Sequence, residues 1–487
     1  MAASRKSKVF SLSLAQGVLT LSGVVSSMVF TRLLSKEDYA TYLQTFLAYD
    51  FVTPLLTLGI PSALYYFLPN ERHGKKVVTE VMLLLLLMGS VYSLFMLCGG
   101  TSLLAKRFSN PALTETLPWL NAYPLYTFPV ACLSAILVVN DKVILNSRYN
   151  VLTGLALTLL TIVATVIGHN YVYPLAVKIA FPLLIFPLAL YFAFRYTAGT
   201  FEMPEASNMW KILKFSVPLG MASIFASLAL QLSNVIVSSF CPPGDYAIYA
   251  VGAREIPLIS AITGSVAVVI MADMAKQIKE GRREEALQLF NKGTTATSML
   301  LMPIMVFFFV FSDSFIQTLF SHSYSDSIIP FRIYLFYLPI RIAQYNSVYI
   351  AFGQSRAVLF RTTLHMLLTV LFCVVFVWLF GYWGAALGAI LASYLWAVPY
   401  NIVKLSEAFH CKKREVLPFS KIGNSLMFSV ICGLVSFPCL LISSSPLVTF
   451  CIGGGVYFTA YYLLMSRFNP DFKQLTYPII RKIQRKR

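Results

Sequence analysis

The sequence predicts an all-α, polytopic membrane protein with about fourteen transmembrane helices. Of its 487 residues, 57% are hydrophobic and only 12% are charged, which is about half the charged fraction of a soluble protein. The mean hydropathy is +0.72, and no stretch is long and polar enough to form a separate soluble domain. We therefore expect nearly the whole chain to lie in lipid, where helices satisfy their own backbone hydrogen bonds.

The apolar runs follow one another along the whole chain, and each can cross about 30 Å of hydrocarbon, the shortest only just. The first run follows Arg5, Lys6 and Lys8, as in a signal peptide. However, it is too long for a signal-peptide core and no A-x-A cleavage site follows it, so we interpret it as a membrane helix. The predicted spans are 9–30, 42–68, 77–100, 117–140, 151–168, 173–196, 211–240, 246–274, 288–313, 328–351, 355–380, 384–406, 420–443 and 445–466.

The distribution of Lys and Arg predicts the orientation of these helices. If the N-terminus is cytoplasmic, thirty of the 38 Lys and Arg residues fall in cytoplasmic segments. Only Arg32, Lys36, Lys106 and Arg107 fall in outer loops. This bias agrees with the positive-inside rule. We therefore predict a multi-pass protein of the cell inner (plasma) membrane with both termini in the cytoplasm.

Composition also excludes several classes of function. A net charge of +18 would suggest nucleic-acid binding in a soluble protein, but here the charge lies in short loops between apolar runs. None of the eight cysteines forms a C-x-x-C motif, and no histidine pair has metal-ligand spacing. We expect no nucleic-acid partner, no metal site and no cofactor.

An internal repeat divides the chain. Residues 38–42 read Asp-Tyr-Ala-Thr-Tyr and residues 245–249 read Asp-Tyr-Ala-Ile-Tyr, 207 positions later. The repeat predicts an N-lobe at 1–200 and a C-lobe at 207–408, related by a pseudo-two-fold axis along the membrane normal. Two further helices at 420–466 and a basic cytoplasmic tail at 467–487 complete the chain. Two lobes around a cavity are typical of transporters that work by alternating access.

Two motifs resemble a known family. Residues 31–42 read T-R-L-L-S-K-E-D-Y-A-T-Y after the first helix, and residues 381–389 read G-Y-W-G-A-A-L-G-A at the start of the twelfth. Both resemble polysaccharide-biosynthesis, O-antigen-type flippases of the multidrug/oligosaccharidyl-lipid/polysaccharide exporter superfamily. The helix count, the six-plus-six repeat and the terminal pair also fit, so the resemblance covers nearly the whole chain.

The resemblance implies translocation of a polyprenyl-pyrophosphate-linked oligosaccharide to the outer leaflet, for O-antigen, lipopolysaccharide or capsule synthesis. It also implies alternating access coupled to H⁺ or Na⁺, as in an antiporter. Its partners would be membrane lipids and polysaccharide polymerase or assembly proteins. The alternative within the superfamily is an ion-coupled exporter of drugs or other small molecules.

Ionisable residues inside predicted spans are costly, so each needs a reason. Their charges sum to a net positive value, as a pyrophosphate would require. Lys178 and Arg332 lie near helix ends, where extension of the side chain to the interface is an equal or better explanation, whereas Arg341 lies near mid-depth. The residues concerned are Asp50, Lys178, Arg254, Glu255, Arg332 and Arg341.

A polar face on the tenth predicted helix surrounds Arg341. Tyr334, Tyr337, Gln344 and Tyr345 fall on the same side of a helix as Arg341, where rings and an amide beside a guanidinium suit sugar and phosphate. A polar seam between helices is the alternative. The first helices of both lobes are also polar, which favours a wet cavity over polar contacts between helices. The full predicted substrate-binding set is Arg341, Arg254, Gln344, Tyr334, Tyr337, Tyr345, Lys178, Arg32, Gln16 and Asn234.

Asp50 and Glu255 are the predicted ion-coupling residues, because carboxylates at similar depth in the two lobes can carry a proton or bind Na⁺. The alternative is a static salt bridge to Arg254 or Arg341. An enzyme is a weaker interpretation. His322 and Asp326 form an H-x-x-x-D pattern in an outer loop, but no catalytic neighbours accompany them, so we predict no catalytic residues.

Overall fold

A computed structural model describes residues 5–70, 73–256, 259, 263–264, 273–274, 276–442 and 445–474. Within these ranges, the regular secondary structure is helical throughout. Ten of the described helices are long and apolar enough to cross a membrane, and a bent pair, Leu113–Leu120 with Tyr123–Val139, makes an eleventh if it counts as one span. The chain is therefore an all-helical, polytopic membrane protein, as the sequence predicts.

Three of the fourteen predicted spans lie outside that count. The span at 246–274 falls largely outside the described residues. The span at 211–240 lies in a long helix of which only Ser227–Phe240 stands as a shorter apolar helix. The span at 328–351 is divided into three short helices. The count of fourteen therefore stays a prediction.

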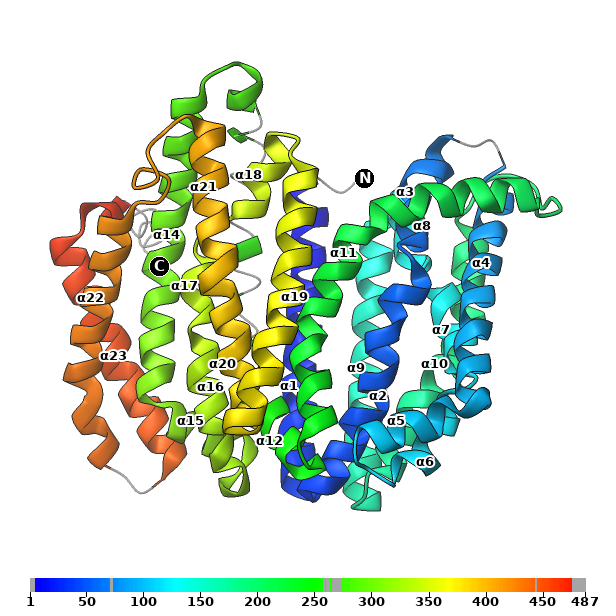
Figure 1. The fold of residues 1–487 in the computed structure, drawn as a ribbon, viewed down its shortest axis with the longest axis horizontal. Coiled ribbons are helices and arrows are strands. Elements are labelled where there is room, and N and C mark those ends of the chain that lie inside the picture. The colour runs from blue at the N-terminus through cyan, green and yellow to red at the C-terminus, as the bar shows by residue number, and fades with distance from the viewer. Residues whose placement is uncertain are drawn as a thin grey trace, which may run out of the picture. The chain divides into compact units, whose positions relative to one another are not determined.

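The chain forms two compact units, one of Met1–Tyr249 with Val377–Ala385 and the other of Ala250–Phe376 with Ala386–Arg487. The first contains α1 (Arg5–Leu33), α2 (Lys36–Thr57), α3 (Ile60–Asn70), α4 (Gly74–Phe95), η1 (Met96–Gly100), α5 (Thr101–Arg107), α6 (Leu113–Thr116), η2 (Leu117–Leu120), α7 (Tyr123–Val130), α8 (Leu133–Val139), α9 (Val143–Gly168), α10 (Val172–Arg195), α11 (Ala206–Phe240) and most of α12 (Pro243–Gly252) (Figure 1).

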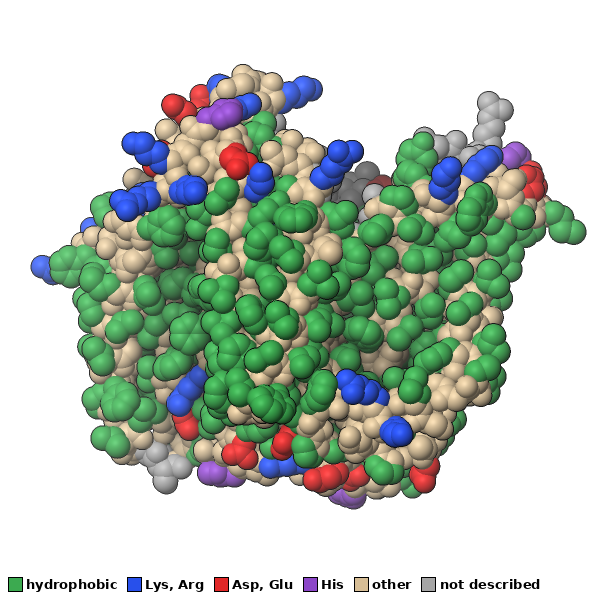
Figure 2. Space-filling model, viewed as in Figure 1, with side chains coloured by type: hydrophobic (Ala, Val, Ile, Leu, Met, Phe, Trp, Pro, Cys, Tyr) green, Lys and Arg blue, Asp and Glu red, His purple; other side chains and the backbone are tan. Residues whose placement is uncertain are grey.

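The second unit contains α14 (Arg283–Val310), α15 (Ser312–Phe320), η3 (His322–Ser327), α16 (Ile328–Leu335), α17 (Tyr337–Arg341), α18 (Tyr345–Ala351), most of α19 (Ser355–Phe380) and of α20 (Tyr382–Ala392), η4 (Ser393–Ala397), α21 (Val398–Phe409), α22 (Phe419–Ser436), η5 (Phe437–Leu441) and α23 (Pro446–Phe468). In each unit, hydrophobic side chains cover the middle of the helices and charged side chains gather at the helix ends (Figure 2). Large apolar side chains stay exposed, such as Leu184 at 76%, as expected where lipid is the solvent.

Buried polar side chains connect α11 to α2 within the first unit. The Gln44 side-chain amide donates to the Ser238 hydroxyl of α11 at 2.9 Å, and Asn110 donates to Gln44 at 2.7 Å. Gln44 and Ser238 are fully buried, so breaking these hydrogen bonds would leave polar groups unsatisfied. α11 thus packs with the first unit, whereas the repeat assigns it to the C-lobe at 207–408. The lobe boundaries remain a prediction.

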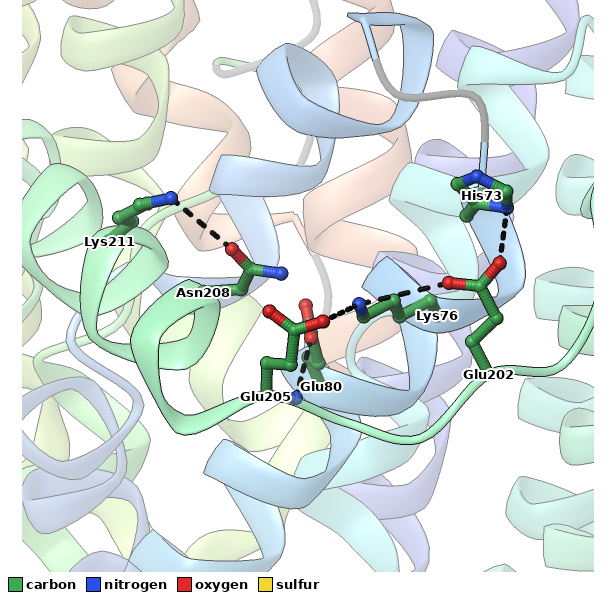
Figure 3. Close-up of polar contacts among 7 residues, drawn as sticks. All are labelled: His73, Lys76, Glu80, Glu202, Glu205, Asn208 and Lys211. Carbon is green, nitrogen blue, oxygen red and sulfur yellow. Dashed lines mark hydrogen bonds and ion pairs between the residues drawn. The ribbon is translucent and has the colours of Figure 1, made fainter.

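The segment between α10 and α11 is fastened to α4 (Figure 3). His73 pairs with Glu202 at 2.7 Å, and Lys76 pairs with Glu205. The buried Glu80 carboxylate accepts the Glu205 backbone N–H at 3.0 Å. The hydrogen bond from Lys76 lowers the pKa of the Glu205 carboxyl. These contacts hold the linker between α10 and α11, residues 196–205, in place.

Apolar packing in the second unit brings the terminal helix pair onto α14. Phe307 of α14 and Phe311, just after its end, pack with Tyr457 and Tyr461 of α23, and the Tyr461 hydroxyl donates to the Met299 backbone carbonyl at 2.9 Å. A Cβ at Gly453 would lie 2.2 Å from the Phe311 ring, so only glycine lets the two helices approach so closely.

Candidate functional site

Arg341 and Glu255 form a direct ion pair in the second unit. The Arg341 Nη2 donates to Glu255 Oε2 at 2.9 Å, and the two side chains are 39% and 38% exposed. The pair brings together a predicted substrate-binding residue and a predicted ion-coupling residue. Because both groups are accessible, the pair can open to take another anion or cation.

The chain around Glu255 differs from the predicted continuous helix at 246–274. α12 ends at Gly252, and residues 253–256 are irregular, with the Arg254 N–H bonded to the Gly252 carbonyl. Pro257 in the sequence disfavours helical geometry at Ile256, the last residue of this irregular stretch. Arg254 and Glu255 therefore extend from a helix end. Arg254 is half-buried and also interacts with other groups.

The predicted helix at 328–351 is also broken. It divides into α16, α17 and α18, with Phe336 and residues 342–344 between them. Pro339 lies at the centre of α17 and cannot donate to the carbonyl four residues earlier, so a break near this position is expected. The single polar face predicted from helical spacing is therefore not present.

The break separates the residues predicted to share that face. The Tyr334 and Tyr337 rings stay together edge-to-face, with centroids 5.2 Å apart, near Arg341. The Gln344 amide donates to the Arg341 backbone carbonyl at 3.4 Å. Tyr345 turns into the core of the unit, where it is 7% exposed and lies near Phe290.

Lys178 and Asp50 form a second couple of opposite charges, in the first unit. The Lys178 ammonium of α10 lies 3.5 Å from the centroid of the Phe46 ring and 5.1 Å from that of Tyr42, both on α2. Asp50 lies one turn beyond Phe46 and its charge interacts with that of Lys178. Among the described residues, no direct ion pair joins the two, so aromatic rings rather than the carboxylate hold the ammonium.

A cavity of about 550 Å³ in the first unit is lined in part by the face of α2 that bears Asp50, although Asp50 is not itself a lining residue. Thr53, Pro54 and Thr57 line it, at three, four and seven residues beyond Asp50, which is the same face of α2. Asp50 is itself exposed. The remaining lining is Gly59, Ser62, Tyr65, Gly220, Ile224 and Ser227. The lining is therefore mixed in polarity, and Asp50 precedes it by about one turn on the same face of α2.

Two glycines form one wall of this cavity. Gly59 has a φ of +69°, and a Cβ on it would lie 2.7 Å from the Gly220 Cα. A Cβ on Gly220 would lie 2.9 Å from the Gly59 Cα. The backbones of the α2–α3 turn and of α11 thus touch directly, and any side chain would push them apart.

The other predicted binding residues lie away from these couples. Gln16 and Arg32 are exposed on α1, and Arg32 has further interactions. The Asn234 amide donates to Gln231 of the same helix at 3.1 Å. Arg332 pairs with Asp313 at 2.6 Å. Arg332 is thus paired with a carboxylate, whereas the sequence favoured extension of its side chain to the membrane interface.

Arg361 and His365 were missed by the sequence reasoning. Charge counting assigned Arg361 to a cytoplasmic segment, but it lies inside α19 and donates to the Asn401 and Asn346 side chains at 3.0 Å. His365 lies one turn further and hydrogen-bonds with the Ser393 hydroxyl at 3.0 Å. The signal was available, because both residues lie within the apolar run at 355–380 and share a helix face.

No group of three or more His, Cys, Asp or Glu side chains suited to a metal ion occurs in the part of the chain that the structure describes.

Comparison with known proteins identifies the fold and the family. A family model described as polysaccharide biosynthesis protein matches residues 29–329. The structure of a lipid II flippase, MurJ, in an inward closed conformation has a TM-score of 0.75 at 16% identity, covering 95% of this chain and 99% of that one. No curated protein sequence matches this chain.

Two further solved structures share the fold. An inward-facing multidrug resistance MATE transporter of the MOP superfamily has a TM-score of 0.64 at 15% identity, covering 80% of this chain and 95% of that one. A MOP-superfamily transporter from Pyrococcus furiosus, described as having a binding pocket of reverse polarity, has a TM-score of 0.59 at 16% identity, covering 84% of this chain and 98% of that one.

Proposed function

Because this chain belongs to the polysaccharide biosynthesis protein family and has the fold of the MOP-superfamily transporters, we propose that it is a flippase. Its substrate is a polyprenyl-pyrophosphate-linked oligosaccharide, which it moves from the cytoplasmic to the outer leaflet of the inner membrane for surface polysaccharide synthesis. Fourteen helices in two lobes, with the terminal pair, perform alternating access. The polymerase and assembly proteins that use the product are its proposed partners.

The Arg341–Glu255 pair is the observation that carries this proposal. A single carboxylate occupies the guanidinium fork, at 2.9 Å, and leaves Arg341 39% exposed. A pyrophosphate carries more negative charge than a carboxylate and offers oxygens to both arms of the fork, so it competes well for Arg341. The Tyr334 and Tyr337 rings nearby offer apolar faces to a sugar.

The same pair provides a route to ion coupling. A proton on Glu255 removes its charge and frees Arg341 for the substrate anion, so proton binding and substrate binding favour each other. Asp50 provides a second carboxylate, which is accessible to H⁺ or Na⁺ beside the cavity of the first unit. Release of the cation on the outer side then returns Glu255 to Arg341 and displaces the substrate, so this scheme moves the cation in the same direction as the substrate, unlike the antiport that the resemblance implies.

Reconstituted vesicles test the flippase directly. Purified protein in vesicles should move a fluorescent polyprenyl-pyrophosphate sugar between leaflets, faster with a proton or sodium gradient. Deletion of the gene should make the lipid-linked sugar accumulate on the cytoplasmic leaflet. Transport at the rate of empty vesicles, from well-folded protein under every gradient, would contradict the proposal.

A second candidate, an ion-coupled exporter of small cationic compounds, is favoured by one observation. Asp50 is an accessible carboxylate beside a cavity that Pro54, Tyr65 and Ile224 line in part, which suits an apolar cation. The same vesicles distinguish the two functions, because an exporter accumulates a cationic dye and a flippase moves the lipid-linked sugar.

A further inference from the structure

Arg361 differs from the other arginines in its partners. It lies six residues after Ser355, about 9 Å along α19. Its Nη1 donates to the Asn401 side-chain oxygen and its Nη2 to the Asn346 side-chain oxygen, both at 3.0 Å. Its guanidinium also lies 5.8 Å from the centroid of the Tyr349 ring. All of these partners are neutral.

Two other arginines inside predicted spans of the second unit are paired with carboxylates. Arg341 pairs with Glu255, and Arg332 pairs with Asp313. Among the described residues, no carboxylate lies within ion-pair distance of Arg361, although the side chain is partly buried. A partly buried charge without a counter-charge is costly, so an anion from outside the chain is the expected partner.

The surroundings of Arg361 form a built site with one open side. Asn401 is 2% exposed and also accepts the Tyr349 hydroxyl at 3.0 Å, so it is fixed in place. Trp396 donates to the Arg361 backbone carbonyl at 3.2 Å. Asn346, on the other arm of the fork, is exposed. Two of the five guanidinium N–H groups bond to the asparagines, and the others remain to bind oxygens.

The charges near the site favour an anion. Arg356, five residues earlier on α19, is exposed, and Glu407, the acidic residue of α21, pairs with Lys404 at 2.7 Å. Large apolar side chains on the same helices face outward, with Ile350 65% and Phe360 56% exposed. A lipid chain can therefore lie against the helices while its polar head reaches the guanidinium.

We propose that Arg361, with Asn346 and Asn401, binds a phosphate group between α18, α19 and α21 of the second unit, about 9 Å from the start of α19. The guanidinium fork suits phosphate oxygens, and the asparagines hold the fork in position. The phosphate comes from a membrane phospholipid or from the pyrophosphate of the lipid-linked substrate before it reaches Arg341. Only the second source rests on the proposed function.

Asn346→Asp is the sharpest test of the site. It is isosteric and places a carboxylate on Arg361 itself, so the new internal ion pair should keep the protein folded and exclude the phosphate. Arg361→Gln removes the charge, and Arg361→Lys keeps it without the fork. Arg356→Gln is the matched control, because it removes an exposed positive charge five residues away on the same helix. Size exclusion and thermal melting check the fold of each variant.

Binding is measured on the full-length protein by native mass spectrometry after release from vesicles of phosphatidylethanolamine and phosphatidylglycerol. A second arm titrates lipid-free protein in detergent with undecaprenyl pyrophosphate. Asn346→Asp and Arg361→Gln should lower the affinity for one of these two ligands at least about tenfold. Arg361→Lys should lower that affinity less, and Arg356→Gln should bind like the wild type. The ligand affected identifies the source.

Two results would overturn the site. One is unchanged affinity of both folded variants for both lipids. The other is an equal loss in Arg356→Gln, which would indicate general surface attraction. Neither result bears on the flippase itself, because that proposal is judged by translocation and by the Arg341 variants.

Discussion

The two carboxylate–cation couples, one in each unit, hold the same pair of charges in opposite ways. In the second unit, Arg341 and Glu255 are in direct contact at 2.9 Å. In the first unit, the Lys178 ammonium rests on Phe46 at 3.5 Å, and Asp50 is left exposed beside a cavity. Arginine offers a planar fork that matches a carboxylate, whereas lysine is a point charge that aromatic faces can hold.

The comparison suggests that the two units have different roles in transport. A closed pair must open before it binds a ligand, so it can link the binding of an anion to the release of a carboxylate. An open carboxylate can take a cation without breaking any ion pair. We therefore expect substitution of Arg341 to affect mainly substrate movement and substitution of Asp50 to affect mainly coupling.

Arg341→Ala should have the largest effect. Loss of the fork should reduce translocation more than about tenfold, since a charge-assisted hydrogen bond contributes about 1.5–3 kcal/mol. Arg254→Ala should also lose most translocation, and lysine at either position should retain part of it. Surface polysaccharide in a deletion strain, with protein level checked, measures the effect.

Arg332→Ala is the matched control for this test. Arg332 pairs with Asp313 in an accessible ion pair, with side chains 39% and 52% exposed, so its loss should cost little. Normal polysaccharide from a well-expressed Arg341→Ala, Arg254→Ala double variant would remove the role of these arginines and the contrast between the two couples.

Substitution of the carboxylates should separate coupling from movement. Asp50→Asn cannot exchange a cation, so transport should lose several-fold stimulation by a proton or sodium gradient while movement without a gradient persists. Glu255→Gln should lose coupling and also leave Arg341 permanently unpaired. Transport in vesicles with and without each gradient measures both. Full gradient dependence in both variants would show that neither carboxylate couples transport.

Gly220→Ala tests whether the wall of the first cavity depends on backbone contact. A Cβ there would lie 2.9 Å from the Gly59 Cα, and such overpacking costs about 1–3 kcal/mol. Gly59→Ala adds the strain of a positive φ. Gly23→Ala in α1 is the control, because nothing lies within 4 Å of its added Cβ. Thermal melting should show a lower Tm for Gly220→Ala and Gly59→Ala but not for Gly23→Ala. Equal Tm values for all three variants would contradict the close contact between Gly59 and Gly220.

Phe46→Leu tests whether the Phe46 ring positions Lys178 in the first unit. Loss of the ring should remove a cation–π contact of about 0.5–2 kcal/mol and let Lys178 turn toward Asp50. Gradient-dependent transport should weaken as Asp50 becomes paired. Phe46→Tyr keeps a ring and should behave like the wild type. Indistinguishable coupling in all three proteins would mean that the ring does not position Lys178.

Glu205→Gln should have the smallest effect, and only at neutral pH. Because Lys76 lowers the pKa of Glu205 in the folded protein, the pair stabilises the linker above the ordinary glutamate pKa and loses that contribution as the pH falls through the lowered pKa. Proteolysis of the segment at 197–208 should be slightly faster in the variant at neutral pH and equal to wild type in acid. Glu115→Gln, an exposed acid remote from the linker, controls for general charge.

Features that depend on local sequence could be predicted, whereas features that depend on contacts between helices could not. Hydropathy and charge act along the chain, so the helical class, eleven of the fourteen spans and the family could be read from the sequence. The tyrosine face around Arg341 could not, because it assumed one straight helix and Pro339 divides that helix. Arg361 was counted among the cytoplasmic charges because a charge near the end of an apolar run looks the same whether it faces water or neighbouring helices.

The sequence by itself determined that this chain is an all-helical membrane protein of a polysaccharide biosynthesis family, with charged residues at costly positions inside its spans. Only the tertiary structure decided how those charges are partnered: Arg341 by Glu255, Lys178 by two rings, and Arg361 by two asparagines. The physical reason is that burial in lipid is a property of each segment, whereas the partners of a charge are side chains that other helices bring into contact with it.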